Sequence, residues 1–259
     1  MHSTASEIVR YLRASRDFVS GQEIADRLGM TRAAVWKHIR ALRITGFEIS
    51  SVTNRGYRLD SVPDLPSEEV LYSLLNTSRF GKTIEYHSVT PSTNSRAMSL
   101  GHQGAAEGTV VTADSQTAGK ARGGGTWESP SGKNLYISVL LKPGISTEFV
   151  FQLDRLALNA LAVTVGEFCP ALQLSLEETG LFSEGGKVGG VLCEVCGEIG
   201  NIHHAVVGFG LNVTHHAKVP GSVSILELTG KTLSRAELTV SVLEHFENSY
   251  LEWTNHEKI

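Results

Sequence analysis

The chain has 259 residues, of which 41% are hydrophobic and 19% charged, and its formal net charge is −4. This composition is typical of a soluble globular protein with a sizeable core and excludes an intrinsically disordered chain. We expect neither a membrane span nor a secretory signal, because no apolar run approaches roughly 18 residues and the N-terminus lacks an unbroken apolar segment. The three cysteines predict reduced thiols and a cytoplasmic protein.

The charges are unevenly distributed along the chain. Residues 1–62 hold ten Lys and Arg against six Asp and Glu, whereas residues 63–259 hold thirteen against twenty-one. A small basic module in front of an acidic body is the electrostatic pattern of a DNA-binding appendage.

Three helices are predicted in the N-terminal segment. Apolar residues at helical spacing indicate the first over residues 5–15, Ser20 and Gly29 are the expected caps of the second, and the third begins after Thr31 and ends at Gly46. Two helices joined by a short turn form a helix-turn-helix, whose second helix enters the major groove of DNA. The residues that we expect to face DNA from this helix are Thr31, Arg32, Trp36, Lys37, Arg40 and Arg43.

A β-hairpin is predicted directly after these helices. Alternating apolar residues flank the turn "TNRG" in "FEISSVTNRGYRL". The hairpin would be a wing, with Arg55 at its tip reaching a phosphate or the minor groove. Residues 1–62 are therefore interpreted as a winged helix-turn-helix. A small helical domain for protein contacts is the alternative, and Trp36 is equally well explained as a packing residue.

The remainder of the chain has a different texture. Two prolines among polar residues mark residues 63–82 as a linker and connecting helix. From residue 83 to 259, short β-rich runs alternate with helical stretches, which predicts an α+β fold with a mixed sheet flanked by helices.

A glycine-rich cationic stretch is the most distinctive feature of this second part. "QTAGKARGGGTWESPSGKNLYISVLL", residues 116–141, places five glycines, two lysines and an arginine around the start of a buried strand. Exposed backbone N–H groups and cations suit a loop that folds over an anion, whereas the bland interpretation is a plain turn.

The order of motifs resembles one known family. "PSTNSRA", the glycine-rich stretch, "GGKVGGVLCE" and "VVGFGLNV" follow one another as in the catalytic domain of biotin–protein ligases. With the winged helix-turn-helix in front, the chain resembles the bifunctional bacterial biotin ligases that repress the biotin operon. The resemblance implies activation of biotin by ATP with Mg²⁺ to biotinyl-5′-adenylate, and transfer to a lysine of a biotin carboxyl carrier protein. It also implies operator DNA and a ligand-dependent homodimer.

The resemblance also implies roles for individual residues. The biotin-binding positions are Ser92, Thr93, Asn94, Gln116, Gly119, Gly189 and Gly190. The positions on the nucleotide side are Trp127, Lys187 and Asn212, and the catalytic cations are Lys120, Arg122 and Lys187. Neutral donors and acceptors suit the uncharged ureido ring of biotin, and cations suit the phosphate.

The sequence departs from the family in two places. The family's Lys-Trp-Pro-Asn-Asp motif is replaced by "LEETG" at residues 176–180, where Glu177 and Glu178 would repel a phosphate if they faced the pocket. We also expect the family's C-terminal SH3-like domain to be missing, by truncation or naturally. Three functions stay open: a biotin-responsive repressor with retained but impaired ligase activity, a fully active ligase using Lys120 or Lys187, and a regulator that binds another carboxylic acid such as lipoate.

The pair Cys193 and Cys196 in "CEVC" has the spacing of a zinc or redox pair, and four histidines follow. Residues three apart on a strand point to opposite faces, so the two thiols cannot easily share a metal. We expect buried free thiols and no bound metal. Ser92 lacks the surroundings of a catalytic nucleophile and is interpreted as a capping or ligand hydroxyl.

Overall fold

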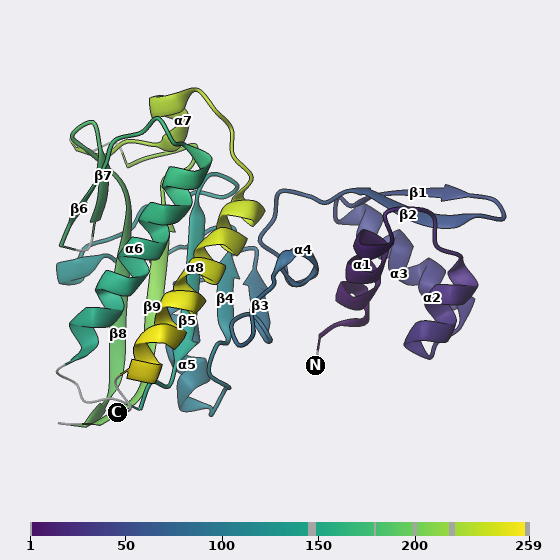
Figure 1. The fold of residues 1–259 in the computed structure, drawn as a ribbon, viewed down its shortest axis with the longest axis horizontal. Helices are drawn as coiled ribbons and strands as arrows, with labels where there is room; N and C mark the ends of the chain where they lie inside the picture. The colour runs from purple at the N-terminus through teal and green to yellow at the C-terminus, as the bar shows by residue number, and fades with distance from the viewer. Residues whose placement is uncertain (1, 145–148, 179, 199–200, 218–220, 257–259) are drawn as a thin grey trace.

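The computed structural model describes residues 2–144, 149–178, 180–198, 201–217 and 221–256 (Figure 1). The N-terminal module has the predicted order of elements. They are the helices α1 (Thr4–Ser15), α2 (Gly21–Leu28) and α3 (Arg32–Ile44) and the antiparallel hairpin of β1 (Glu48–Val52) and β2 (Gly56–Ser61).

The predicted helix caps of this module are confirmed. The Ser20 hydroxyl accepts a hydrogen bond from the Glu23 backbone N–H at 3.0 Å, and the Thr31 hydroxyl accepts one from Ala34 at 3.2 Å. Gly29 has φ +65°, the left-handed conformation that ends α2. The turn between α2 and α3 is therefore fixed by local sequence.

The segment predicted as a linker is packed into the fold. Its helix α4 (Glu68–Leu74) lies between the module and the larger body, and Val70 belongs to the hydrophobic core of the module whereas Leu71 belongs to that of the body (Figure 1). Just before it, Asp64 accepts hydrogen bonds from the backbone N–H and guanidinium of Arg235, which is itself buried. Residues 63–82 thus hold the two parts together.

A seven-stranded mixed sheet forms the body, as predicted. Its strands lie in the order β3-β4-β5-β9-β8-β7-β6, and β3 and β4 are parallel while the other neighbours are antiparallel. Their bounds are β3 (Ile84–His87), β4 (Val110–Ala113), β5 (Leu135–Leu141), β6 (Leu174–Glu177), β7 (Gly180–Ser183), β8 (Gly186–Glu198) and β9 (Asn201–Leu211).

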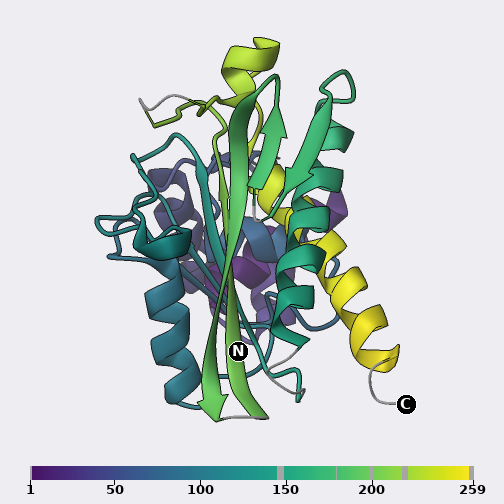
Figure 2. The ribbon, with the colours of Figure 1, turned by 90° about the vertical axis from the view of Figure 1, so that its left-hand side faces the viewer.

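Helices cover both faces of this sheet (Figure 2). One face carries α5 (Thr93–His102), and the other carries α6 (Val150–Phe168) and α8 (Arg235–His256). The short α7 (Ile225–Thr229) follows β9, and a 3₁₀ turn, η1 (Arg122–Gly124), lies in the glycine-rich stretch. Among the described residues, none of the helices combines the length and apolar character needed to span a membrane.

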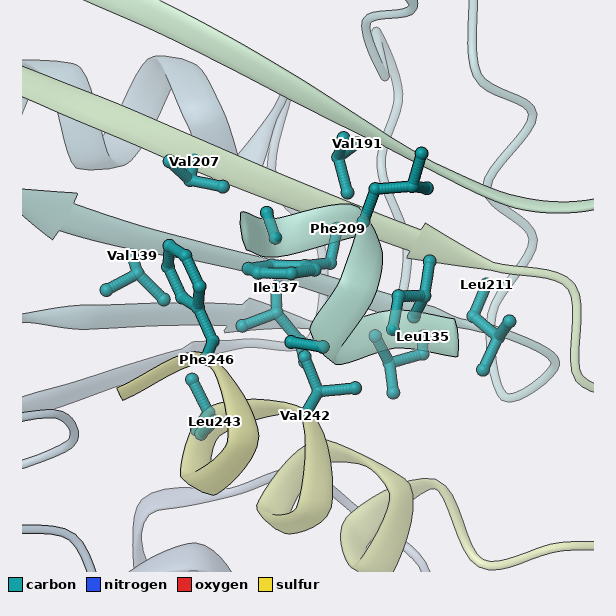
Figure 3. Packing of buried hydrophobic residues seen from close by; sticks show 14 of the residues in the cluster. Leu135, Ile137, Val139, Val191, Val207, Phe209, Leu211, Val242, Leu243 and Phe246 are labelled. Carbon is teal, nitrogen blue, oxygen red and sulfur yellow. The ribbon is translucent and has the colours of Figure 1, made fainter. Parts of the chain in front are cut away.

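The main core lies between the sheet and the α6–α8 layer (Figure 3). Phe209 of β9 meets Phe246 of α8 edge to face, with ring centroids 5.2 Å apart, and Ile137 and Val242 pack beside them. Burying each such side chain stabilises the fold by about 1.5–3 kcal/mol. This packing leaves the α5 face of the central strands available for a polar site.

Candidate functional site

One cavity lies on the α5 face of the sheet, and the separated motifs of the sequence meet in it. Its walls come from the start of α5, the glycine-rich stretch, β5, β8 and β9. The lining residues are Ser92, Thr93, Asn94, Gln116, Lys120, Ala121, Arg122, Trp127, Tyr136, Ile137, Lys187, Gly190, Val191, Leu192, Gly208, Phe209 and Gly210.

Neutral polar groups form one end of the cavity. The Gln116 carbonyl oxygen accepts hydrogen bonds from the Thr93 backbone N–H at 2.8 Å and from the Thr93 hydroxyl at 3.2 Å. The Gln116 amide donates to the hydroxyl of Ser129 at 2.9 Å, and Ser92 caps α5 by accepting from Ser95. These contacts orient uncharged donors and acceptors before any ligand arrives.

Asn94 is the most constrained of these polar residues. Its carbonyl oxygen accepts from the Ser138 hydroxyl at 2.6 Å, and its amide donates to the Leu192 carbonyl at 3.2 Å and the Glu194 carboxylate at 2.9 Å. A Cβ on Gly208 would lie 2.1 Å from the Asn94 carbonyl oxygen. Only glycine at position 208 is therefore compatible with this arrangement.

The glycine-rich stretch folds back on itself and still borders the cavity. Lys120 and Thr126 form a β-bridge, and Gly123 and Gly124 between them have φ of +68° and +77°. A Cβ on Gly119 would lie 2.4 Å from the Trp127 carbonyl oxygen, so glycine is needed at the base of this turn. The turn interpretation and the anion-loop interpretation are thus compatible, because the turn presents its cations to the cavity.

Both cations of the loop are paired with carboxylates. The Lys120 ammonium lies 2.9 Å from Glu194, and the Arg122 guanidinium lies 2.8 Å from Asp154, whose side chain is 10% exposed. Burial raises the pKa of the Asp154 carboxyl, and Arg122 only partly opposes this effect. An anionic ligand would have to compete with these two carboxylates for the loop.

Lys187 provides a third cation, and it is held differently. Its ammonium lies 5.8 Å from the centre of the Trp127 ring, and in the described part of the chain no carboxylate lies within ion-pair distance of it. Burial, together with the positive charge of Arg122, lowers the pKa of the Lys187 ammonium. A half-buried cation without a carboxylate partner gains from binding an anion.

A second pocket of about 280 Å³ adjoins the cavity through Trp127 and Lys187, which line both. Asn212 lies on its wall, buried, and its amide donates to the carbonyl oxygens of Lys187 and Val223 at 3.2 Å each. The indole N–H of Trp127 is buried and has no hydrogen-bond partner among the described residues. The two pockets together form one site with a polar end and a cationic middle.

One expectation about the lining is wrong, and one open condition is not met. Gly189 does not face the cavity, because a Cβ there would lie 3.0 Å from a Leu161 methyl group under α6, whereas its neighbour Gly190 lines the cavity. Successive strand residues point to opposite faces, so only one of the two glycines can do so. The glutamates at 177 and 178 are exposed around the β6–β7 hairpin and do not line the cavity, so they cannot repel a ligand there.

Sequence reasoning also missed several residues of the site. The residues that contact the predicted ones but were not singled out are Glu194, Asp154, Ser138, Gly208 and Gly210. The signal for Gly208 and Gly210 was present, since both glycines of "GFG" lie on one strand face at a spacing of two.

The residues of α3 that were expected to face DNA are exposed, but Arg43 has a structural contact as well. Trp36 is 54% exposed with the Arg40 guanidinium 5.7 Å from its ring, which rules out the interpretation of Trp36 as a packing residue. Arg43 instead donates to the Ile49 carbonyl at 2.9 and 2.5 Å and thereby ties α3 to the wing. At the wing tip, Arg55 pairs with Asp17 at 3.2 Å. Thr31, Arg32 and Lys37 remain exposed.

Comparisons with known proteins agree with the division of the chain into an N-terminal module and a larger body. A profile of an HTH domain matches residues 4–58, and that of the biotin/lipoate A/B protein ligase family matches residues 86–212. The bifunctional ligase/repressor BirA of Bacillus subtilis is 34% identical over 95% of this chain and 78% of its own length. The same-named protein of Escherichia coli is 29% identical over 78% of this chain and 61% of its own length. The biotin protein ligase from Aquifex aeolicus, solved in complex with biotin and ATP, has a TM-score of 0.57 and 27% identity, covering 67% of this chain and 72% of that one.

Proposed function

Because the chain belongs to the family of bifunctional biotin ligase/repressors, we propose that it is a biotin-responsive DNA-binding repressor whose body binds biotin and biotinyl-5′-adenylate. The single observation that carries this proposal is the convergence of residues 92–94, 116–127 and 187–210 on one cavity. Its polar end suits an uncharged ring, and its cations suit a phosphate.

In the proposed complex, the ureido ring of biotin lies at the polar end. The ring offers one carbonyl acceptor and two N–H donors and carries no charge. Hydroxyls and amides of Ser92, Thr93, Asn94 and Gln116 can pair with all of these groups without leaving a buried charge unpaired. Gly190 lets its strand approach the ring closely, and Gly208 makes room for the Asn94 side chain beside it.

The carboxylate of biotin then points toward the cationic middle of the site, where MgATP is the second substrate. A carboxylate oxygen attacks the α-phosphorus and pyrophosphate leaves; the lysine amine of the carrier protein later attacks the acyl carbon and AMP leaves. Lys120, Arg122 and Lys187 balance the charge that builds on the phosphate, and Trp127 and Asn212 border the adenosine. The chain's own contribution is orientation and charge, not a covalent intermediate.

We further propose that adenylation is retained but slow. The "LEETG" segment brings no cation to the cavity, and Leu176 is 45% exposed on the edge strand β6. An oriented ammonium at a developing negative charge contributes about 3 kcal/mol, or roughly a hundredfold in rate. Lys187, the half-buried cation of the site, is the residue best placed to supply part of that effect.

Two measurements on the full chain test these proposals. Calorimetry with biotin, alone and with MgATP, should show binding, and lipoate should not compete. A transfer assay with a carrier domain should show turnover well below that of a ligase with the family's lysine. If biotin gave no binding heat and lipoate did bind, lipoate and not biotin would be the ligand. Turnover equal to that of a ligase with the family's lysine would overturn the proposal of slow adenylation.

DNA binding is proposed for α3 and the wing, through Thr31, Arg32, Trp36, Lys37, Arg40 and Arg55. These residues are exposed on the basic module. Arg40→Ala should weaken operator binding about tenfold and reduce the slope of log affinity against log salt by about one. Arg13→Ala, an exposed arginine of α1 on the same module, is the matched control. An unchanged slope for Arg40→Ala would show that Arg40 of α3 does not contact the DNA phosphates.

A ligand-dependent homodimer is proposed through the edge of β8. Strand β7 pairs with β8 only as far as Gly190, and Val195 beyond it is 42% exposed. An unpaired strand edge with an apolar residue is a template for pairing with a second copy. Val195→Asp should keep the protein monomeric in sedimentation experiments with biotin and MgATP, whereas Val163→Asp, on exposed α6 surface, should dimerise as the wild type does.

The proposed location of the chain is the cytoplasm. Its three cysteines form no disulfide, which fits a reducing compartment.

A further inference from the structure

A cluster of soft donors lies on the same sheet face as the cavity but outside it. His102 ends α5, Cys196 is near the end of β8, and His204 is on β9, where it pairs directly with Cys196 across the strands. One imidazole nitrogen of each histidine and the thiol sulfur lie within 4.8 Å of one another, and His102 Nε2 is 3.4 Å from Cys196 Sγ. Residues from three elements thus aim their donor atoms at one point.

His204 is the residue that packing alone explains least. It is 4% exposed, and within the described ranges the hydrogen-bond-distance partner of its Nε2 is the thioether sulfur of Met98 at 3.2 Å. A thioether is only a weak acceptor, so this buried imidazole is poorly satisfied. Gly101 makes room for the ring, since a Cβ there would lie 2.6 Å from Nε2.

We propose that His102, Cys196 and His204 form a binding site for a thiophilic transition-metal ion, Zn²⁺ or Cu⁺, with Met98 as a further ligand. In a tetrahedral site with bonds of about 2.0 Å to nitrogen and 2.3 Å to sulfur, neighbouring ligand atoms are about 3.5 Å apart. The His102–Cys196 separation already matches this value. His102 is exposed, so its side chain can close the remaining distance.

This site is independent of the proposed biotin site. His102 follows Asn94 by eight residues on α5, which is about 12 Å along the helix. The cavity ends at Leu192 on β8 and Gly208 on β9, whereas Cys196 and His204 lie further toward the β8–β9 turn. Cys193 and Cys196 do not share this site: Cys193 contacts the α6 layer, and the partners of Cys196 are histidines.

The test uses Co²⁺ as a spectroscopic probe of the reduced full-length protein, followed by Zn²⁺ competition against a chromophoric chelator. One equivalent of Co²⁺ should give a thiolate-to-metal charge-transfer band that Zn²⁺ abolishes. Cys196→Ser should remove the band, and His102→Ala, at an exposed position, should lower Zn²⁺ affinity by more than about a hundredfold, beyond the roughly 10–100-fold that loss of an outer-shell partner costs.

Matched controls lie on the opposite faces of the same strands. Cys193→Ser and His203→Ala should keep both the band and the affinity, and circular dichroism establishes that each variant is folded. Met98→Leu separates the ions, because loss of the thioether should weaken Cu⁺ binding more than Zn²⁺ binding. A band that survives Cys196→Ser, or a wild type without any thiolate band in excess Co²⁺, would overturn the proposal. Neither result depends on biotin, ATP or DNA.

Discussion

The two ends of the cavity are built on opposite principles. At the polar end, Thr93, Asn94 and Gln116 are held by hydrogen bonds to one another and to neighbouring strands. At the cationic end, Lys120 and Arg122 sit on a turn, where Lys120 pairs with the partly exposed Glu194 and Arg122 pairs with the buried Asp154. The first end is preorganised for an uncharged ring, whereas the second must exchange partners when a phosphate arrives. Binding of biotin and binding of the nucleotide should therefore respond to different mutations.

The largest expected effect is on the preorganised end. In Gly208→Ala, the new Cβ would lie 2.1 Å from the Asn94 carbonyl oxygen, so Asn94 must leave its position. Displacing it breaks the contact with buried Ser138 and overfills the cavity, which costs about 2–6 kcal/mol in total. We expect biotin affinity, measured by calorimetry, to fall about a hundredfold or more.

Gly166→Ala is the matched control, because a Cβ there meets nothing within 4 Å. Biotin binding should stay at the wild-type level in that variant, and thermal stability should be equal or slightly higher, because alanine is more favourable than glycine inside a helix by about 0.5–1 kcal/mol. If Gly208→Ala also bound biotin normally, the ring would not lie beside Asn94.

The second-largest effect is expected at the cationic end of the cavity, which Lys187 also lines. Lys187→Met keeps the length of the side chain but removes the ammonium beside Trp127. We expect biotin-dependent pyrophosphate release to slow about a hundredfold while biotin affinity stays unchanged. Lys133→Met, at an exposed position just after the loop, should leave both quantities unchanged. Equal losses of biotin affinity and of rate in Lys187→Met would erase the distinction between the two ends.

The pH dependence sharpens the same distinction. Burial lowers the pKa of Lys187, so its positive charge is present at low pH and is lost, as pH rises, before that of an ordinary lysine, whose pKa is about 10.4. Affinity for a non-hydrolysable biotinyl-adenylate analogue should fall on the alkaline side, and affinity for biotin should not. The two calorimetric profiles check this difference. In Lys187→Met the alkaline fall should be absent; its persistence would assign the titration to another group.

The smallest effect concerns Glu194, which joins the two ends. Its carboxylate accepts from Asn94 with one oxygen and pairs with Lys120 through the other. Glu194→Gln keeps an acceptor for Asn94 but releases Lys120, and such partly exposed pairs contribute about 0.2–1 kcal/mol. We expect the adenylate analogue to bind about two- to fivefold more tightly. Glu198→Gln, further along β8 and exposed, should change nothing, and a weakened Glu194→Gln would show that Glu194 helps the ligand.

Local signals predicted the N-terminal module well. The caps Ser20, Gly29 and Thr31 act on residues only a few positions away, so the sequence specifies them directly. The β-rich runs of the body were also recognisable from their apolar patterns. The β6–β7 hairpin was not, because its strands are only four residues long and Glu178 adopts φ +43°, which a non-glycine residue rarely does.

The site was predictable only as far as its motifs. Motif residues such as Asn94 and Trp127 could be named in advance, but the carboxylates that neutralise the loop could not. Asp154 lies on α6 and Glu194 on β8, and their contacts with Arg122 and Lys120 join residues 32 and 74 positions apart. Such pairs depend on how the sheet and helices pack, which no local pattern encodes.

The placement of α4 has a consequence for the spacing of operator half-sites that the proposed dimer would accept. Val70 and Leu71 are consecutive, yet one is anchored in the module and the other in the body, so the helix cannot turn in one without disturbing the other. The N-terminal module is therefore packed rigidly against the body and is not joined to it by a flexible linker. In the proposed dimer, the gap between two operator half-sites would be set by the rigid bodies, and lengthening residues 63–67 should not widen the range of spacings that the protein tolerates.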